Sequence, residues 1–207
     1  MTCIVALTDG GTVHMAGDSG CCFGQRLVQL EEPKVFAVGD MLIGDSGTVR
    51  AGQILRHAFT PPPIPAGKVD LTGYFAGAFY AALLEAYAAG DLRDKSDSCD
   101  MLIGLRGRIY HLSSDGAVTV DARRSHVAIG NGAPYALGAM FAAPTKSAPR
   151  VRLAIGLEAA AHHVAGIIKP FSYRYLEAES VADRPRRGSV SPAAAPKKER
   201  RRRRQAA

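Results

Sequence analysis

Short apolar runs separated by glycine-rich turns fill the first fifty residues of the chain. Residues 3–7 and 12–17 lie on either side of Asp9-Gly10-Gly11, which has the composition of a hairpin turn. The next apolar runs of this kind are residues 27–30, 34–38 and 41–43. The pattern therefore predicts that the chain begins with several antiparallel strands.

After the turn-like segment Gly44-Asp45-Ser46-Gly47, the apolar positions follow a helical period. Val49, Ile54, Leu55 and Phe59 predict a first helix, which Pro61-Pro62-Pro63 stops. An i, i+3, i+4 stripe predicts a second helix over residues 71–89, ended by Gly90-Asp91.

The second half of the chain repeats the order of strands followed by two helices. We expect strands at 101–105, 108–112, 118–120 and 127–129, helices at 134–141 and 150–168, and a last strand at 171–175. Strand runs that alternate with helix pairs indicate an α+β fold in which two antiparallel sheets pack together and helices cover both outer faces.

Length and charge divide the chain into a body and a tail. The 207 residues have room for one domain, which we place at residues 1–176, and apolar patterning disappears from residue 177 onward. The net charge of +7 arises in the tail, because residues 184–207 alone carry +9 and the other 183 residues sum to −2. We expect residues 177–207 to be a disordered basic tail, either solvated without a target or contacting nucleic acid or another polyanion.

The composition gives no sign of a membrane, secreted or metal-binding protein. The sequence has no apolar run of about eighteen residues and no signal-peptide pattern, so we expect a cytoplasmic protein. Its cysteines, Cys3, Cys21, Cys22 and Cys99, have neither zinc-site spacing nor the density of a disulfide scaffold. We expect reduced thiols and no metal or organic cofactor.

Three residues near the N-terminus suggest nucleophilic chemistry. Removal of Met1 would leave Thr2 with a hydroxyl and a free α-amine, which is a nucleophile with its own base. Lys34 beside that amine would favour its neutral form, and Asp18 is a candidate anionic partner for Lys34. Taken singly, Asp18 can also be a turn residue and Lys34 a charge that protects a strand edge.

The segment MTCIVALTDGGTVHMAGDSG, followed by EEPKVF and later by HVAIGNGAPYALGAMFA, resembles proteasome β-type subunits and the bacterial HslV peptidase. The resemblance covers about residues 2–175. It implies a four-layer αββα sandwich of the N-terminal nucleophile hydrolase type and threonine-type peptidase activity. It also implies that Thr2 is the nucleophile and that Asp18 and Lys34 support it.

The resemblance assigns further residues to the site. The backbone amide of Gly47 corresponds to the donor that stabilises the oxyanion, and Asn131 stands where many members have a serine that binds the N-terminal amine. The substrate pocket corresponds to Cys21, Glu32 and Asp45. The carboxylates of Glu32 and Asp45 favour Lys or Arg before the cleaved bond. His162 and Ala165 replace an aspartate and a serine on a late helix, which leaves room for a slow or inactive enzyme.

Several alternatives stay open at this point. Gly-Asp-Ser-Gly occurs twice, but too little chain precedes either serine for a trypsin-like protease. A catalytically silent scaffold with a polyanion-binding tail is the main alternative, and small-molecule amide hydrolysis is a third. We expect a polypeptide substrate and a homo-oligomer, while no residue pattern identifies an ATPase or other substrate-delivering partner.

Overall fold

The computed structural model describes residues 1–67, 69–92, 99–123 and 125–178, and the predicted basic tail lies outside them from residue 179 onward. The strands are β1 (Ile4–Asp9), β2 (Thr12–Gly17), β3 (Gly20–Phe23), β4 (Arg26–Gln29), β5 (Val35–Val38), β6 (Met41–Gly47), β7 (Cys99–Leu105), β8 (Arg108–Leu112), β9 (Val118–Thr119), β10 (His126–Ile129) and β11 (Ser172–Leu176). The helices are α1 (Val49–His57), α2 (Leu71–Tyr74), the π-helix η1 (Phe75–Phe79), α3 (Tyr80–Ala89), α4 (Ala133–Ala142) and α5 (Pro149–His163).

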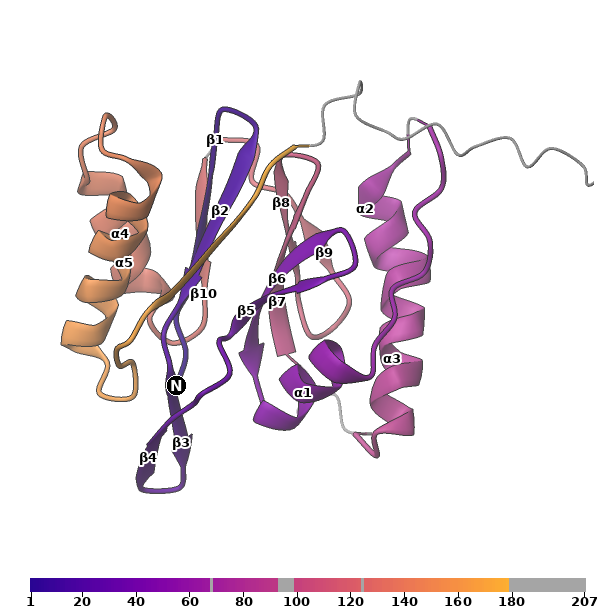
Figure 1. The fold of residues 1–207 in the computed structure, drawn as a ribbon, viewed down its shortest axis with the longest axis horizontal. Coiled ribbons are helices and arrows are strands. Elements are labelled where there is room, and N and C mark those ends of the chain that lie inside the picture. The colour runs from indigo at the N-terminus through magenta and orange to yellow at the C-terminus, as the bar shows by residue number, and fades with distance from the viewer. Residues whose placement is uncertain (68, 93–98, 124, 179–207) are drawn as a thin grey trace, which may run out of the picture.

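The elements form four layers (Figure 1). One sheet has the strand order β10-β1-β2-β11 and is covered by α4 and α5. The second sheet has the order β5-β6-β7-β8-β9 and is covered by α1 and by the continuous segment α2-η1-α3. The architecture is the predicted αββα sandwich, and β3 and β4 form a separate hairpin that projects near the N-terminus (Figure 1).

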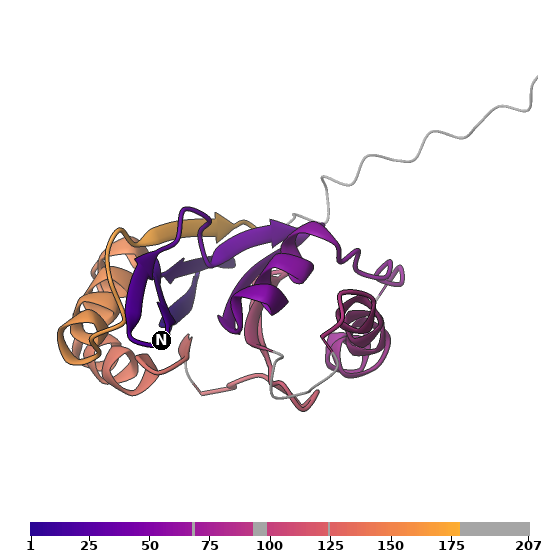
Figure 2. The ribbon, with the colours of Figure 1, turned by 90° about the horizontal axis from the view of Figure 1, so that it is seen from below.

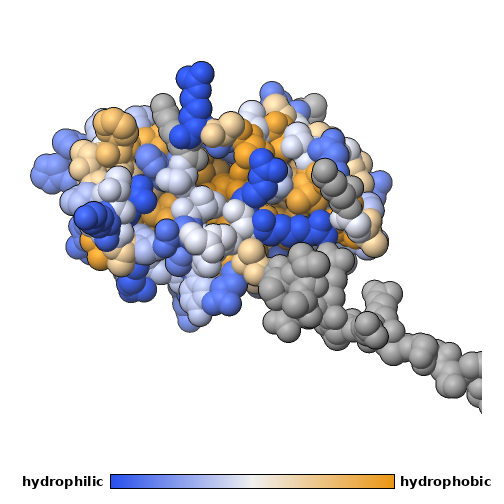
Figure 3. All heavy atoms as spheres, turned by 90° about the horizontal axis from the view of Figure 1, so that it is seen from above, coloured by the Kyte–Doolittle hydropathy of each residue, from blue (hydrophilic) through white to orange (hydrophobic). Residues whose placement is uncertain are grey.

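Three apolar clusters hold the layers together. One lies between α4, α5 and the first sheet, and another lies between the second sheet and the other helices, where Phe75 and Phe79 are fully buried. The third fills the space between the two sheets with side chains such as Ile4, Met15 and Leu102. Seen from the end opposite the N-terminus, apolar side chains show between polar ones (Figure 3).

The first hairpin forms as the sequence predicts. Gly10 and Gly11 have φ angles of 53° and 85°, which suit the two central residues of a tight hairpin turn and favour glycine. The strands pair from Asp9 with Thr12 back to Ile4 with Gly17. Residue 18 is therefore returned to the start of β1.

The structure departs from the predicted elements in three places. The sequence does not predict β3, which begins at Gly20. The segment 44–47 is not a turn but the end of β6, where each residue has a partner in β7. The helix predicted to reach Ile168 ends at His163, because the following backbone is drawn to the N-terminal site, where Ser19 donates to the carbonyl of Ile168.

Among the described residues, no helix combines the length and the apolar character that crossing a membrane requires.

Candidate active site

Thr2 lies two residues before the start of β1, at the end of the sandwich where the N-terminus emerges (Figures 1 and 2). The residue is buried, and its Oγ1 donates to the carbonyl oxygen of Met1 at 2.8 Å. The amide of Gly132 donates to the carbonyl oxygen of Thr2 at 3.2 Å. The Thr2 backbone is therefore fixed by the residue that precedes α4.

Asp18 follows β2 and lies opposite Cys3, as the hairpin register requires. Its side chain is buried, and two backbone amides satisfy it: Cys3 donates to Oδ1 at 2.9 Å and Gly20 donates to Oδ2 at 2.8 Å. These bonds hold the carboxylate in one orientation beside Thr2.

Lys34 precedes β5 and joins Thr2 to Asp18. Its Nζ lies 3.1 Å from Thr2 Oγ1 and 3.0 Å and 3.1 Å from the two oxygens of Asp18. It also donates to the carbonyl oxygens of Gly20 at 2.6 Å and Met1 at 3.2 Å. Lys34 is only 8% exposed and its ammonium is surrounded by oxygen acceptors, so the structure brings together all three residues singled out near the N-terminus.

A glycine-containing segment packs directly against Thr2. A Cβ on Gly130 would lie 2.4 Å from the Thr2 carbonyl oxygen and 2.9 Å from Ser46 Oγ, so only glycine fits there. Gly47 follows Ser46 as the last residue of β6, immediately before Thr48, which caps α1. Asn131 is exposed, and among the described residues no hydrogen bond joins its side chain to Thr2.

His162 and Ala165 stand apart from the three-residue cluster. His162 is exposed at the end of α5, where its ring packs against that of His163. Ala165 does not lie on a helix, contrary to the prediction, because α5 ends two residues earlier. The neighbouring Gly166 instead packs against Met1 and Cys22, where a Cβ would lie 2.6 Å from Met1 Cβ and 2.9 Å from Cys22 Sγ.

A cavity of about 220 Å³ adjoins Lys34. Glu32 and Asp45 both line it, together with Gln53 and Arg56 of α1, whereas Cys21 lies in β3 opposite Val28 and is not among the lining residues. Burial raises the pKa of the Asp45 carboxyl to about 6, although the positive charges of Lys34 and Arg56 act in the opposite direction. This carboxyl is therefore protonated below about pH 6 and ionised at neutral pH.

Other reactive groups near the site are less suitable. Burial raises the pKa of the Cys3 thiol to about 12, and the charge of Asp18 adds to the effect, so this thiol stays protonated at neutral pH. Within the described part of the chain, no group of three His, Cys, Asp or Glu side chains is placed to hold a metal ion.

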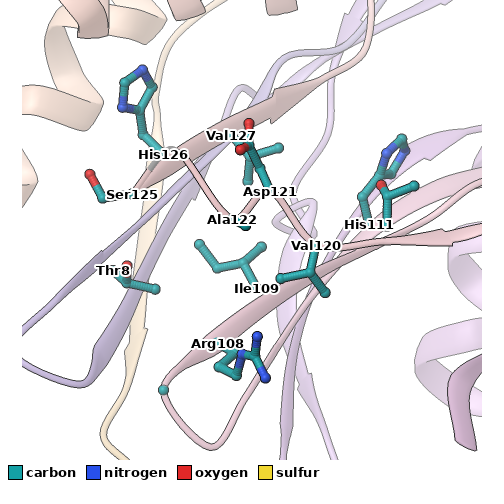
Figure 4. A pocket seen from close by; sticks show the side chains of 12 residues that line it. Thr8, Arg108, Ile109, His111, Val120, Asp121, Ala122, Ser125, His126 and Val127 are labelled. Atoms are coloured by element: carbon teal, nitrogen blue, oxygen red, sulfur yellow. The ribbon is translucent and has the colours of Figure 1, made fainter. Parts of the chain in front are cut away.

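A second cavity of about 370 Å³ lies between β8–β9 and β1–β10 (Figure 4). Ile109 lies near its centre, with Arg108 and His126 toward opposite ends (Figure 4). None of Thr2, Asp18 and Lys34 lines it. The candidate active site is therefore the cluster at the N-terminus with its adjoining 220 Å³ cavity.

Sequence reasoning missed three parts of the site. The carbonyl of Gly20 accepts the shortest hydrogen bond of Lys34, and Arg56 forms a wall of the cavity. No motif marks Arg56, because its place follows from the packing of α1 on β5. Gly132 had a signal in the Gly-Asn-Gly turn, but only the structure shows its bond to Thr2.

Neither a protein-family model nor a curated protein matches this sequence. Solved structures do match. BPH from Thiobacillus denitrificans, in complex with Epoxomicin, superposes with a TM-score of 0.74 at 22% identity, over 86% of this chain and 100% of that chain. HslV from Trypanosoma brucei has a TM-score of 0.62 at 18% identity, over 85% of this chain and 99% of that chain.

Anbu, an ancestral beta-subunit from Yersinia bercovieri, has a TM-score of 0.63 at 15% identity, over 85% of this chain and 82% of that chain. These likenesses concern the whole four-layer body, and they confirm the fold that the sequence predicted.

Proposed function

We propose that this chain, which has the proteasome-like fold of HslV, is a threonine-type endopeptidase whose nucleophile is Thr2 after removal of Met1. The observation that carries the proposal is the buried contact of Lys34 Nζ with both Thr2 Oγ1, at 3.1 Å, and Asp18 Oδ1, at 3.0 Å. A lysine held in this way lowers the cost of developing negative charge on the threonine oxygen.

The proton that leaves Thr2 needs an acceptor other than Lys34. A charged ammonium has three donors and no acceptor, and Asp18 and the carbonyl of Gly20 are already bonded to it. While Met1 is attached, the nitrogen of Thr2 belongs to a peptide bond and is not basic. Once Met1 is removed, the free amine is the nearest base, and the charge of Lys34 favours its neutral form.

The proposed reaction has two stages. Thr2 Oγ attacks the peptide carbonyl while the Thr2 amine, directly or through a water, takes the hydroxyl proton; it then passes this proton to the nitrogen of the leaving amine, which departs to give an acyl-enzyme. Water then releases the acyl group and restores the hydroxyl. We assign the amide of Gly47 as a donor to the oxyanion and Asn131 as a partner of the Thr2 amine.

We also propose that the chain works as a homo-oligomer on polypeptide substrates. Support comes from apolar side chains that a lone copy leaves in water, including Phe141, which is 84% exposed.

The direct test combines chemistry at Thr2 with matched variants. Intact mass reports whether Met1 is removed, and a peptide epoxyketone tests Thr2, since its ketone can react with the hydroxyl and its epoxide with the amine. Thr2→Ala and Lys34→Met should abolish both labelling and peptide hydrolysis, whereas Thr12→Ala at the far end of the hairpin should leave both unchanged. Undiminished hydrolysis by Thr2→Ala would rule out the proposal.

One observation favours a second candidate, a catalytically silent scaffold. Asn131 and His162, which replace supporting residues of the resembled family, are both exposed rather than bonded to Thr2. A correctly processed protein that gives neither adduct nor hydrolysis would support this candidate. Deletion after Asp183 should then reduce salt-sensitive binding to a polyanion, because the removed segment carries +9.

A further inference from the structure

The 220 Å³ cavity beside Lys34 has an unusual set of charges. It lies between the segment before β5, the end of β6 and the inner face of α1, which packs against both strands (Figure 1). Its lining residues are Leu30, Glu31, Glu32, Pro33, Lys34, Asp45, Val49, Gly52, Gln53 and Arg56. Since Lys34 touches Thr2 Oγ1, a side chain in this cavity would sit beside the proposed nucleophile.

Asp45 fits into the cavity because Gly52 of α1 has no side chain. A Cβ on Gly52 would lie 2.6 Å from Asp45 Oδ2, so the carboxylate rests directly against the helix. Glycine inside a helix costs about 0.5–1 kcal/mol relative to alanine, and here it makes the space that the carboxylate occupies. Among the described residues, Asp45 forms no salt bridge.

Glu32 is different, because Arg56 and His57 already hold it. Arg56 Nε lies 3.8 Å from Glu32 Oε2, and His57 Nε2 lies 2.9 Å from Glu32 Oε1. Arg56 is itself fixed, since its guanidinium stacks 3.9 Å from the ring centre of Phe36 and donates to the carbonyl of Pro33. The two carboxylates of the cavity are therefore not equivalent.

We infer that Arg56 is a specificity-determining residue, which holds Glu32 in an ion pair and leaves Asp45 as the carboxylate that selects a cationic substrate side chain. The inference rests on the proposed function and names the substrate class: peptides with Lys or Arg before the cleaved bond. Arg56 also weakens the selection, because its positive charge opposes the cation that Asp45 attracts.

Two matched fluorogenic peptides test this assignment, with Lys or the uncharged norleucine before the cleaved bond. The selectivity is the ratio of their kcat/KM values. Asp45→Asn should lower it about tenfold, because the pairing charge is lost in a partly buried site. Arg56→Met keeps contact with Phe36 but removes the cation and its ion pair with Glu32, which then keeps only the contact with His57, so the variant should raise the selectivity several-fold.

Glu32→Gln separates this inference from the simpler picture of two equivalent carboxylates. In the otherwise unchanged protein, Glu32→Gln should alter the selectivity less than about twofold. In the Arg56→Met background the same substitution should lower the selectivity clearly, since Glu32 and Arg56 are coupled. Arg50→Met is the control on the same helix, because Arg50 bonds the carbonyl of Gly90 outside the cavity and should have no effect.

A binding measurement keeps the inference separate from the proposed catalysis. N-acetyl-lysinamide should shift the NMR signals of Gly52 and Gln53 more strongly than N-acetyl-norleucinamide, and Asp45→Asn should abolish the difference. If Thr2 neither hydrolyses nor becomes labelled, the proposed function fails and this measurement alone decides the inference. Equal binding of the two amides, or an unchanged selectivity in Asp45→Asn and Arg56→Met, overturns it.

Discussion

Lys34 shows how burial narrows the role of a single residue. Its ammonium has five oxygen neighbours within 3.2 Å, of which two belong to Asp18 and three are the Thr2 hydroxyl and the carbonyls of Met1 and Gly20. A buried charge is tolerated when it is paired and hydrogen-bonded, and an ammonium has three donors and no acceptor. Lys34 therefore suits the stabilisation of an anion better than the removal of a proton.

Asp45 leads to a prediction about stability and pH. Its pKa rises from 3.8 to about 6 in the folded protein, mainly through burial, so its ionisation destabilises the fold. Asp45 therefore does not destabilise the fold below about pH 4, and the free energy of unfolding falls as the pH rises through about 6. Asp45→Asn removes this loss and should raise the free energy of unfolding by up to about 3 kcal/mol at neutral pH.

Urea unfolding at several pH values measures the effect. The advantage of Asp45→Asn should shrink toward zero as the pH falls below about 3, where the wild-type carboxyl is protonated in both states. Asp40→Asn, at the exposed turn before β6, is the control and should show no such trend. A difference that stays constant across the pH range would mean that packing of the amide, and not the proton, is responsible.

For single residues, the sequence predicts those positions that are set by segments close to them along the chain. The hairpin register alone places Asp18 beside the start of β1, and the spacing of Lys34 follows from the next strands. The Gly20 carbonyl and Arg56 could not be predicted in the same way. The first depends on the path of the backbone after β2, and the second depends on the rotation of α1 against Phe36.

Among the elements, α4 offers two glycines with opposite surroundings. Gly132, which precedes the helix, is packed so closely that a Cβ would lie 2.8 Å from the Cβ atoms of both Cys3 and Ala160. Gly138 is exposed within the helix, and a Cβ there would meet nothing within 4 Å. The surroundings of Gly132 leave no room for a side chain, whereas those of Gly138 do.

Gly132→Ala should therefore destabilise the protein by about 1–3 kcal/mol through overpacking. Gly138→Ala should stabilise it by about 0.5–1 kcal/mol, because alanine favours the helix. Chemical denaturation of both variants at low protein concentration provides the comparison. An unchanged stability for Gly132→Ala would show that α4 can shift away from β1 without cost.

The elements that the sequence predicts well are those fixed by their own periodicity. The hairpin β1–β2 and the helical segment from Leu71 to Ala89 lie where the pattern predicts them. The errors lie where tertiary contacts decide. The β3 strand forms only because its partner β4 follows across a short turn, and α5 stops early because the carbonyl of Ile168 accepts hydrogen bonds from Ser19.

At the scale of the whole molecule, the outward face of α4 is unusually apolar for a protein that remains a single copy. The segment of α4 contains no charged residue, and its outward positions are Pro134, Tyr135, Gly138, Phe141 and Ala142. Exposed apolar groups on this scale are typical of surfaces that contact another protein. The proposed homo-oligomer would bury them.

Phe141 provides the test of assembly. Its side chain is 84% exposed, so Phe141→Asp should leave the free energy of unfolding of a single copy nearly unchanged. Within an interface, however, the loss of a buried phenyl ring costs up to about 3 kcal/mol, and the new carboxylate adds a desolvation cost. Sedimentation should show a large complex for the unchanged protein and for Phe141→Leu, and smaller species for Phe141→Asp. Identical sedimentation of all three would place the contact between copies on another face.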